Sequence, residues 1–481
     1  MTKIFAVFLI SICTLLSFPI KASTVLPEIG TAGASALTVA KEKEFGWAFH
    51  LMANQALPII HDPVLNEYID ALGQNLVSHA DSVKLPFRFF LIEDNEINAA
   101  AFLGGNVKIN TGLFLYANNE SELAGVLAHE IAHITQRHLA RMLEKQSFSN
   151  PASMAALAGS VLLALVSPTA GIAALTSTMA VSIQSQINYT RKNEYEADRI
   201  GIQTLNNAGY NPFGMADFFG KLAEKYKYAS MPPQMLLTHP LPETRLAEAR
   251  LRASQFEKHH LKPHLAYQLS KSRITVRYNK LTGSAAVDLY KSNLRQNNYV
   301  IKEAAEYGLA LAYFKNKEYV KAHKLILSLL KKSPNNLFYV DLLSDTAMTL
   351  GKTEQAIKLL SRFYAYSPKS SVVTLNLVIA LQTDKQYNKA EGILDHFIRA
   401  NPYHVLAHLI AIDLYKSLKN RAKEHAMKAE YLALKGQFRN ASQEMGTALV
   451  YATSNLDKAR YSAKIESYRK DDLRLKALQN N

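Results

Sequence analysis

Two histidines and a glutamate in VLAHEIAHI have the types and spacing of a hydrolytic metal site. His129 and His133 are four positions apart, so on a helix their rings leave the same face, one above the other. Glu130 lies one step round the helix, within reach of a water held between the two rings. The pattern H-E-x-x-H occurs on the metal-binding helix of many zinc peptidases. It predicts a zinc-activated water with Glu130 as the base that takes its proton.

A helix over 123–143 must carry this motif. The segment has no proline, one glycine and apolar residues at helical spacing, and Asn119 with Glu122 resembles a capping box at its start. On an uninterrupted helix His138 falls half a revolution from His129, so it is not expected to join the site. The motif also arises by chance in unrelated helices. Here its apolar surroundings would bury two histidines, which then need partners.

A catalytic zinc needs a third protein ligand and one open position. The best candidates lie in NEYEADRIG, where Glu194 and Asp198 are again four positions apart on an expected helix. One carboxylate could complete a His/His/Glu set, and the other could orient a ligand histidine or donate to the reaction intermediate. Glu196 is expected to point elsewhere. A charged helix is ordinarily a solvated face, and only its pairing with H-E-x-x-H favours the metal.

HEIAH followed by EYEAD resembles peptidase family M48, whose pattern is HExxH and then ExxAD. The resemblance implies a zincin-like (gluzincin) metalloendopeptidase domain that uses one Zn²⁺ per chain. It implies zinc ligands at His129, His133 and Glu194, with Glu130 as general base. It also implies that Asp198 is a catalytic proton donor or a partner that orients a ligand.

Residues 98–114, NAAAFLGGNVKINTGLF, resemble the edge strand that precedes the metal helix in this family. Their two apolar runs, separated by Gly104 and Gly105, predict a hairpin that turns at these glycines. A small antiparallel sheet is therefore expected in a mainly helical fold. An exposed strand edge beside the metal could hold an extended peptide by strand addition. This fits a protease better than an amidase for small molecules.

His239 is followed by Pro240 and Pro242, and these prolines hold the chain extended. An isolated histidine before a proline is ordinarily a surface or turn residue. Family relatives carry a similar His-Pro segment that returns towards the metal. The sharper hypothesis is that His239 is a regulatory fourth ligand, which displaces the water and keeps the protease latent.

The beginning of the chain has the order of a signal peptide. Residues 1–22 contain Lys3, an uncharged run and small residues near Ala22. A retained membrane anchor is the alternative, because the run is just long enough to span a bilayer. Cys13 is the only cysteine, so the chain without residues 1–22 needs no disulfide. We therefore expect an exported protein.

Residues 146–190, between the two metal motifs, contain no Asp, Glu, Lys or Arg. Pro168 divides the segment into two apolar stretches that are each short for a spanning helix. Three interpretations remain open: a buried helical hairpin that covers the active site, contact with a membrane surface or an unfolded membrane protein, and true spanning.

The whole chain is expected to form two or three domains, because 481 residues are too many for one core. The apolar fraction of 48% and charged fraction of 20% are typical of globular proteins. The formal charge of +15 would suit nucleic acid, anionic lipid or an acidic protein surface. Nucleic acid is not expected, since the chain has no basic run with interleaved aromatic residues.

The C-terminal part shows a repeat with a period of 34 residues. Two series have this spacing: Ala322, Ala356 and Ala390, and Pro334, Pro368 and Pro402. Small residues where two helices cross and a proline at the end are the tetratricopeptide signature. We expect a protease domain over 23–265, a helical connection over 266–301, and an α-solenoid over 302–481 that binds protein segments.

This domain order is similar to that of periplasmic M48 proteases of Gram-negative bacteria. The similarity implies a periplasmic location, with peripheral contact to the outer membrane left open. It also implies a factor that assists assembly of outer-membrane proteins and degrades misassembled ones, with those proteins and their assembly machinery as partners of the repeats. The alternative is mainly a chaperone or assembly adaptor with a latent protease. The intact metal motifs favour catalysis.

Overall fold

The computed structural model describes residues 37–147, 183–228, 230, 233–257, 259 and 261–480. The expected signal peptide, 1–22, and residues 148–182 of the uncharged segment lie outside the described residues. Within the described ranges, none of the helices has the length and apolar character needed to cross a membrane.

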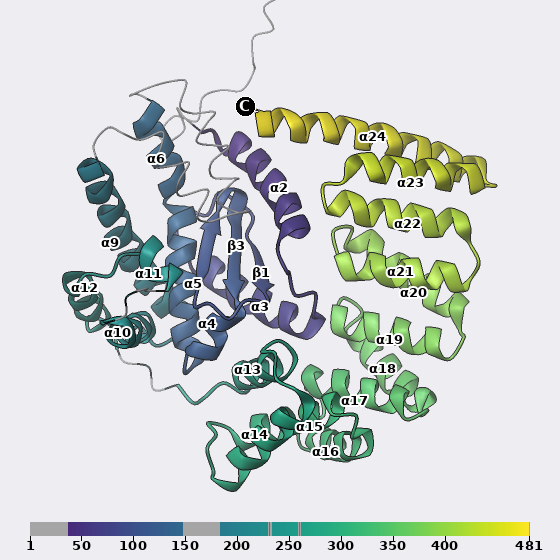
Figure 1. Ribbon diagram of the computed structural model, residues 1–481, viewed down its shortest axis with the longest axis horizontal. Coiled ribbons are helices and arrows are strands. Elements are labelled where there is room, and N and C mark those ends of the chain that lie inside the picture. The colour runs from purple at the N-terminus through teal and green to yellow at the C-terminus, as the bar shows by residue number, and fades with distance from the viewer. Residues whose placement is uncertain are drawn as a thin grey trace, which may run out of the picture.

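A three-stranded sheet lies beside the metal motifs (Figure 1). It consists of β1 (Arg88–Ile92), β2 (Ala99–Phe102) and β3 (Asn106–Asn110), in the order β1-β3-β2. The pair β2–β3 is the expected antiparallel hairpin, but β1 pairs with β3 in parallel. The sheet is therefore mixed and not antiparallel. The chain reverses direction twice, so the first and third strands run the same way, and they are neighbours because β3 takes the central place.

The hairpin turns where the sequence predicts, through η1 (Leu103–Gly105). Gly104 and Gly105 have φ angles of 72° and 82°, in the left-handed region that glycine adopts at little cost. Helix α2 (Val39–Ala56) crosses this turn very closely, since a Cβ atom on Gly46 would lie 2.4 Å from the Cα of Gly104. Glycines on both sides thus allow α2 to pack on the end of β2.

The remaining helices of the N-terminal part surround the sheet and the metal motifs. They are α3 (Pro63–Ser78), α4 (Thr111–Tyr116), α5 (Glu120–Thr135), α6 (His138–Ser147), α9 (Ile183–Asn207), α10 (Gly214–Tyr226), α11 (Gln234–Thr238) and α12 (Glu243–Ala253). At the start of α5 the Asn119 side chain accepts a hydrogen bond from the Glu122 N–H, and Glu122 accepts one from the Asn118 N–H. The expected cap is present.

The prediction of one helix over 123–143 is wrong. Helix α5 ends at Thr135, Arg137 adopts a left-handed φ of 53°, and α6 begins at His138. The buried Arg137 guanidinium donates to Glu42 of α2 and to the Leu37 carbonyl oxygen. This anchorage offsets the cost of the left-handed conformation, and it redirects the residues that follow.

The C-terminal part is an α-solenoid of stacked helix pairs. Its helices are α13 (Leu265–Arg277), α14 (Gly283–Arg295), α15 (Lys302–Lys315), α16 (Tyr319–Lys332), α17 (Leu337–Thr349), α18 (Thr353–Tyr366), α19 (Ser371–Thr383), α20 (Tyr387–Ala400), α21 (Val405–Ser417), α22 (Arg421–Leu434), α23 (Phe438–Tyr451) and α24 (Asn455–Asn480). The repeating alanines Ala322, Ala356 and Ala390 are buried at equivalent places in α16, α18 and α20. Close helix packing therefore explains the 34-residue period.

The solenoid contacts the protease part at its first helix, near its middle and at its last helix (Figure 1). Near its middle, the Glu67 carboxylate of α3 accepts hydrogen bonds from the Ser371 hydroxyl and from the Val372 N–H at the start of α19. At its far end, Arg474 of α24 pairs with Glu44 of α2 and lies 4.5 Å from the ring centroid of Trp47.

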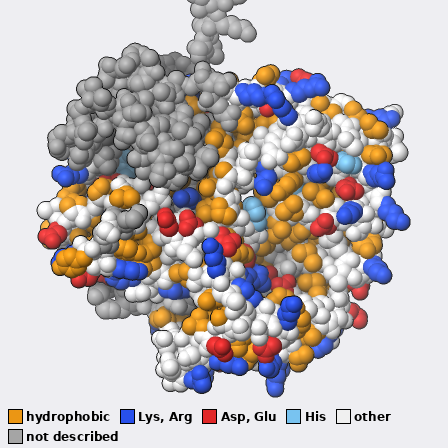
Figure 2. Space-filling model, in the orientation of Figure 1, with side chains coloured by type: hydrophobic (Ala, Val, Ile, Leu, Met, Phe, Trp, Pro, Cys, Tyr) orange, Lys and Arg blue, Asp and Glu red, His pale blue; other side chains and the backbone are white. Residues whose placement is uncertain are grey.

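A buried arginine links the two parts at the first helix of the solenoid. Arg273 of α13 pairs with Asp62, which caps α3, and with Asp341 of α17, each at 2.7 Å. Figure 2 shows Lys and Arg side chains spread along the outer rim of the solenoid, with hydrophobic side chains gathered nearer its middle. The outer surface of the repeats thus carries part of the net positive charge of the chain.

Candidate metal centre

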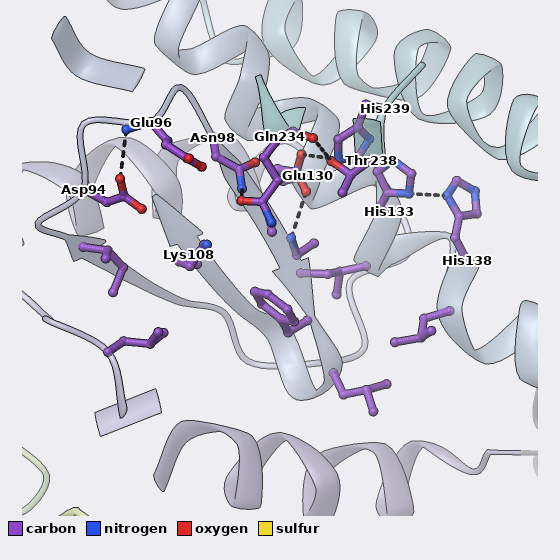
Figure 3. A pocket seen from close by; sticks show the side chains of 18 of the residues that line it. Asp94, Glu96, Asn98, Lys108, Glu130, His133, His138, Gln234, Thr238 and His239 are labelled. Atoms are coloured by element: carbon purple, nitrogen blue, oxygen red, sulfur yellow. Dashed lines mark hydrogen bonds and ion pairs between the residues drawn. The ribbon is translucent and has the colours of Figure 1, made fainter. Parts of the chain in front are cut away.

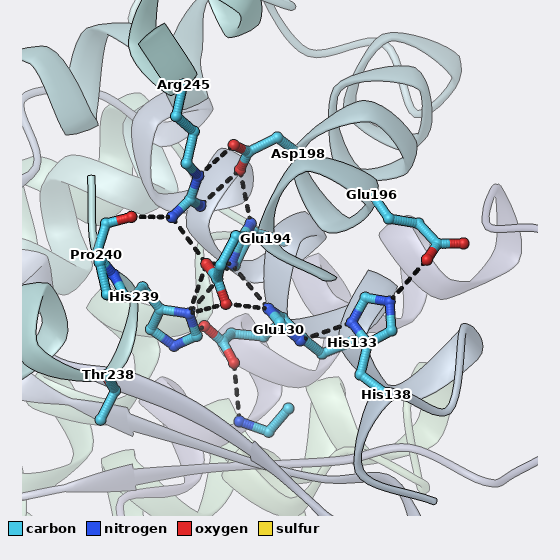
Figure 4. Close-up of polar contacts among 12 residues, drawn as sticks. Glu130, His133, His138, Glu194, Glu196, Asp198, Thr238, His239, Pro240 and Arg245 are labelled. Atoms are coloured by element: carbon cyan, nitrogen blue, oxygen red, sulfur yellow. Dashed lines mark hydrogen bonds and ion pairs between the residues drawn. The ribbon is translucent and has the colours of Figure 1, made fainter. Parts of the chain in front are cut away.

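Four side chains from three elements bring ligand atoms to one place (Figure 4). His129 and His133 come from α5, Glu194 comes from α9, and His239 follows the short helix α11. One ligand atom from each of these residues lies within 4.8 Å of the other three. The structure brings the three ligand residues expected from the sequence together, and His239 lies with them.

The spacing of the four ligand atoms fits a tetrahedral ion. His129 Nε2 lies 3.0 Å from His133 Nε2 and 3.3 Å from His239 Nδ1. The Glu194 oxygens lie 3.4 Å from each of the two α5 imidazoles and 3.1 Å from His239 Nδ1. Ligands bound tetrahedrally to zinc at about 2.0–2.1 Å are about 3.3 Å apart. Nitrogen and carboxylate donors in this arrangement suit zinc.

His129 is oriented by a carboxylate behind it. The Asp198 Oδ1 atom lies 2.9 Å from His129 Nδ1, the ring nitrogen that faces away from the other ligands. Burial opposes a charged imidazole, but Asp198 and Glu194 together raise the pKa of His129 to about 9. A carboxylate in this position fixes the ring and makes it a better ligand.

Arg245 of α12 joins the two carboxylates, and the sequence analysis missed it. Its side chain is 1% exposed and donates through Nε and Nη2 to Asp198, while Nη1 lies 2.8 Å from Glu194 Oε2. The Nη1 group also donates to the carbonyl oxygen of Pro240, directly after His239. Burial opposes ionisation of Asp198, but hydrogen bonds from Arg245 and His129 hold the pKa of Asp198 below its usual value. No local pattern marks this arginine, because its partners are distant in sequence.

Glu130 contacts the edge strand. Its Oε2 atom accepts a hydrogen bond of 2.8 Å from the Ala101 N–H of β2, and its Oε1 atom has no hydrogen-bond partner among the described residues. His239 Nε2 lies 3.5 Å from that free oxygen. Burial raises the pKa of Glu130 above its usual value. A buried carboxylate with one free oxygen and a raised pKa suits a general base.

His133 has a partner that the sequence analysis excluded. His138 Nδ1 lies 2.9 Å from His133 Nδ1, and His138 Nε2 lies 3.3 Å from Glu196 Oε2 (Figure 4). The helical argument against His138 assumed an unbroken helix, whereas the break at Arg137 turns its ring back towards His133. His138 supplies no atom to the group of four ligands.

A cleft of about 600 Å³ opens beside these residues (Figure 3). Glu130, His133 and His239 line one side of it, and β2 lines another. Asn98, directly before β2, donates to the Gln234 side chain of α11, so the two walls are in contact. The backbone N–H of Ala101 points out of the sheet, since it donates to Glu130 and not to β3. An unpaired strand edge in a cleft suits an extended peptide.

Comparison with known proteins places these features in a family. The model of Peptidase family M48 matches residues 63–253. A relative from Vibrio cholerae is 44% identical over 92% of this chain and 91% of its own. The beta-barrel assembly-enhancing protease of Escherichia coli K12 is 41% identical over 94% of this chain and 92% of its own.

Solved structures resemble the chain more distantly. A tetratricopeptide repeat protein from Parabacteroides merdae covers 53% of this chain and 98% of its own, with 16% identity and a TM-score of 0.29. A likeness of that size does not establish a common fold. The solenoid is recognised from its own stacked helices and its 34-residue period.

Proposed function

The chain belongs to peptidase family M48, and from this premise we propose that it is a periplasmic zinc metalloendopeptidase with a chaperone-like role. It promotes assembly of outer-membrane proteins and degrades misassembled ones. The observation that carries the proposal is the convergence of His129, His133 and Glu194 beside Glu130 and an unpaired strand edge. The name of the Escherichia coli relative, which matches nine-tenths of the chain, supports the choice of substrate.

His129, His133 and Glu194 would hold one zinc ion per chain. When bound, zinc would supply a water of lowered pKa and polarise the scissile carbonyl group. Glu130 takes the proton at its free oxygen and returns it to the leaving amine. The edge of β2 aligns the substrate backbone, since the Ala101 N–H can donate to a substrate carbonyl once Glu130 moves away from it.

Asp198 acts as a positioning residue in this proposal. Both of its oxygens are engaged by His129 and Arg245, it is 4% exposed, and it does not line the cleft. These contacts favour orientation of His129 over the role of proton donor. The lowered pKa of Asp198 points the same way, because a proton donor must be protonated at working pH.

His239 is the regulatory ligand of the proposal. A zinc site with four protein ligands is structural, since it has no open position for a water. With His239 in place the protease is latent, and its movement with α11 opens the site. Replacement of His239 by Ala should raise basal cleavage, including self-cleavage, without loss of zinc. A normal or reduced rate on every substrate would rule out this role.

Export and delivery of substrates complete the proposal. Residues 1–22 direct the chain to the periplasm, residues 23–265 form the protease, and residues 266–301 connect it to repeats over 302–481. The repeats bind outer-membrane proteins and their assembly machinery, and nucleic acid is not a partner. The second candidate is a chaperone or assembly adaptor with a latent protease. The fourth donor, His239, is the observation that favours it.

The test uses Glu130→Gln in the full-length chain. The amide cannot accept a proton, so peptide cleavage should fall at least about 100-fold. Zinc content should stay at one ion per chain, because Glu130 is not a ligand. Clients trapped on this variant in the periplasm should be outer-membrane proteins. Retained turnover would remove Glu130 as the base, and a wild-type chain without zinc would refute the proposal.

The metal set has its own matched test on α9. Glu194→Gln should weaken zinc binding, because a neutral amide is a poorer ligand than a carboxylate. Arg199→Gln is the control, since Arg199 is exposed on the same helix and lies outside the group of four ligands. Zinc affinity is measured by competition with a chelator. Equal zinc affinities for the two variants would mean that Glu194 is not the third ligand.

A further inference from the structure

The two ligand histidines of α5 differ in what lies behind them. His129 faces the Asp198 carboxylate, which can accept a hydrogen bond from Nδ1–H without needing a particular tautomer of its own. His133 faces another imidazole, His138, with 2.9 Å between the two Nδ1 atoms. A ligand histidine usually donates its second ring N–H to a carboxylate, a backbone carbonyl or water. An imidazole in this place must have one particular tautomer to do the same.

Zinc binding fixes that tautomer along the whole chain of contacts. His133 turns Nε2 towards the other ligands, so a neutral His133 that binds through Nε2 carries its hydrogen on Nδ1. That N–H can donate only if His138 Nδ1 is unprotonated. The hydrogen of a neutral His138 is then on Nε2, which faces the Glu196 carboxylate at 3.3 Å. Arg141 holds the same Glu196 oxygen at 3.0 Å.

We propose that His138 is a positioning residue for zinc: it accepts a hydrogen bond from His133 and is held in the required tautomer by Glu196. The inference rests on the proposed zinc site and adds a residue outside the ligand set. The line of contacts is His133, His138, Glu196 and Arg141, and it shares no residue with the contacts of Asp198 and Arg245 behind His129.

The local fold supports this role. A residue five positions after His133 on an unbroken helix would point well away from it. The left-handed Arg137, anchored by its buried ion pair with Glu42, ends α5 and starts α6 at His138. His138 is 4% exposed, so its two ring nitrogens depend on protein partners for their hydrogen bonds. The unfavourable backbone conformation of Arg137 thus lies directly before His138, the residue that contacts His133.

The alternative is that His138 is only a buried core residue. Two variants of equal polarity separate the roles. In His138→Asn, the amide oxygen can take the place of Nδ1 and accept from His133. In His138→Gln, the longer side chain puts its polar atoms near the place of Nε2, so it reaches Glu196 and leaves His133 without an acceptor. A structural role predicts that both variants behave alike.

The experiment measures the zinc dissociation constant of the full-length chain by chelator competition. His138→Gln should bind zinc about 10–100-fold more weakly than wild type, the range found when the partner of a ligand histidine is lost. His138→Asn should stay within a few-fold of wild type. Unchanged affinity in both variants, equal weakening in both, or a weaker Asn than Gln variant would each overturn the inference.

A spectroscopic measurement distinguishes loss of the hydrogen bond to His133 from a general destabilisation of the variant. In the zinc-loaded wild type, proton-detected nitrogen NMR should show a hydrogen-bonded Nδ1–H on His133 and a hydrogen on Nε2 of His138. The His133 signal should persist in His138→Asn and move upfield in His138→Gln, while the corresponding His129 signal stays unchanged. Hydrogen on Nδ1 of His138 in the zinc-loaded chain would also overturn the inference. A wild-type chain that binds no zinc would overturn the proposed function itself, which is a distinct result.

Discussion

Arg245 pairs with two buried carboxylates at once, so the metal site depends on its charge when no metal is bound. Its guanidinium is 1% exposed and contacts both Glu194 and Asp198. Removing the charge from one side of a buried ion pair leaves the partner charges without compensation, which costs about 3–5 kcal/mol.

We therefore expect Arg245→Met to lower the free energy of unfolding of the metal-free chain by about 3 kcal/mol or more. The methionine keeps much of the volume and removes only the charge and the hydrogen bonds. Denaturant unfolding measures the loss. Arg250→Met, at an exposed position of the same helix, is the control and should change stability by less than about 0.5 kcal/mol. A similar loss in both variants would mean that methionine disturbs α12 and not the ion pairs.

The ligand residues were predictable from sequence for a physical reason that does not extend to their partners. His129 and His133 lie on one helix, and Glu194 and Asp198 on another, so four-residue spacing alone sets each pair on one face. Arg245 and His138 have no such local rule. The place of Arg245 depends on how α12 packs on α9, and that of His138 depends on a backbone break at Arg137.

At the scale of elements, the close crossing of α2 over the hairpin turn controls the position of the edge strand. Gly46 and Gly104 face each other with no room for a side-chain carbon on either. The edge strand β2 ends at this turn and carries the Ala101 N–H that contacts Glu130. A disturbance at the crossing should therefore reach the catalytic base.

Gly46→Ala should lower the melting temperature and also reduce peptide cleavage by the zinc-loaded chain. A Cβ atom there would lie 2.4 Å from the Gly104 backbone, so α2 or the turn must shift, at a cost of about 1–3 kcal/mol. Gly392→Ala in α20 is the matched control, because nothing lies within 4 Å of its added Cβ. It should be stabilising by up to about 1 kcal/mol through helix propensity alone. An unchanged cleavage rate in a destabilised Gly46→Ala variant would mean that the close contact between α2 and the turn does not affect the active site.

Helices and repeats were predictable because their signals are local. The 34-residue spacing of Ala322, Ala356 and Ala390 reports helix crossings within neighbouring pairs. The hairpin at Gly104 was visible for the same reason. The parallel pairing of β1 with β3 could not be predicted from the sequence. Neither strand carries a residue pattern that indicates which of the other two strands will lie beside it.

At the scale of the whole molecule, neutral histidines lie where the protease part meets the solenoid. His50 of α2 and His404, the cap of α21, both line a cavity of about 510 Å³ between the two parts. Burial, with the positive charge of Arg88 and His61 nearby, lowers the pKa of His50 to about 4. Burial, with His61 and His408 nearby, also lowers the pKa of His404 to about 4.

The folded chain should therefore lose stability as the pH falls from 6.5 towards 4. Histidines in the unfolded chain bind protons near pH 6.5, whereas these two do so only near 4, so unfolding takes up protons in between. His404→Asn keeps an acceptor for the Ala407 N–H but cannot titrate. The fall in melting temperature between pH 7 and pH 5 should be smaller in this variant by roughly 2–4 °C. An equal fall in both proteins would exclude His404 as a source of the pH dependence.

The contacts of the solenoid at α19 and at α24 together have a property that neither has alone. Once Glu67 holds the start of α19, the stiff stack of helices keeps Arg474 close to Glu44 and Trp47, so the second contact forms at a high effective concentration. Loss of either contact should then have little effect on attachment, because the other keeps the partners near. Glu67→Ala and Arg474→Ala should each leave small-angle scattering of the full chain nearly unchanged. The double variant, in which Arg273 still holds α13 to Asp62, should expand by more than the sum of the two. A purely additive expansion would mean that the contacts at α19 and at α24 form independently and that there is no avidity between them.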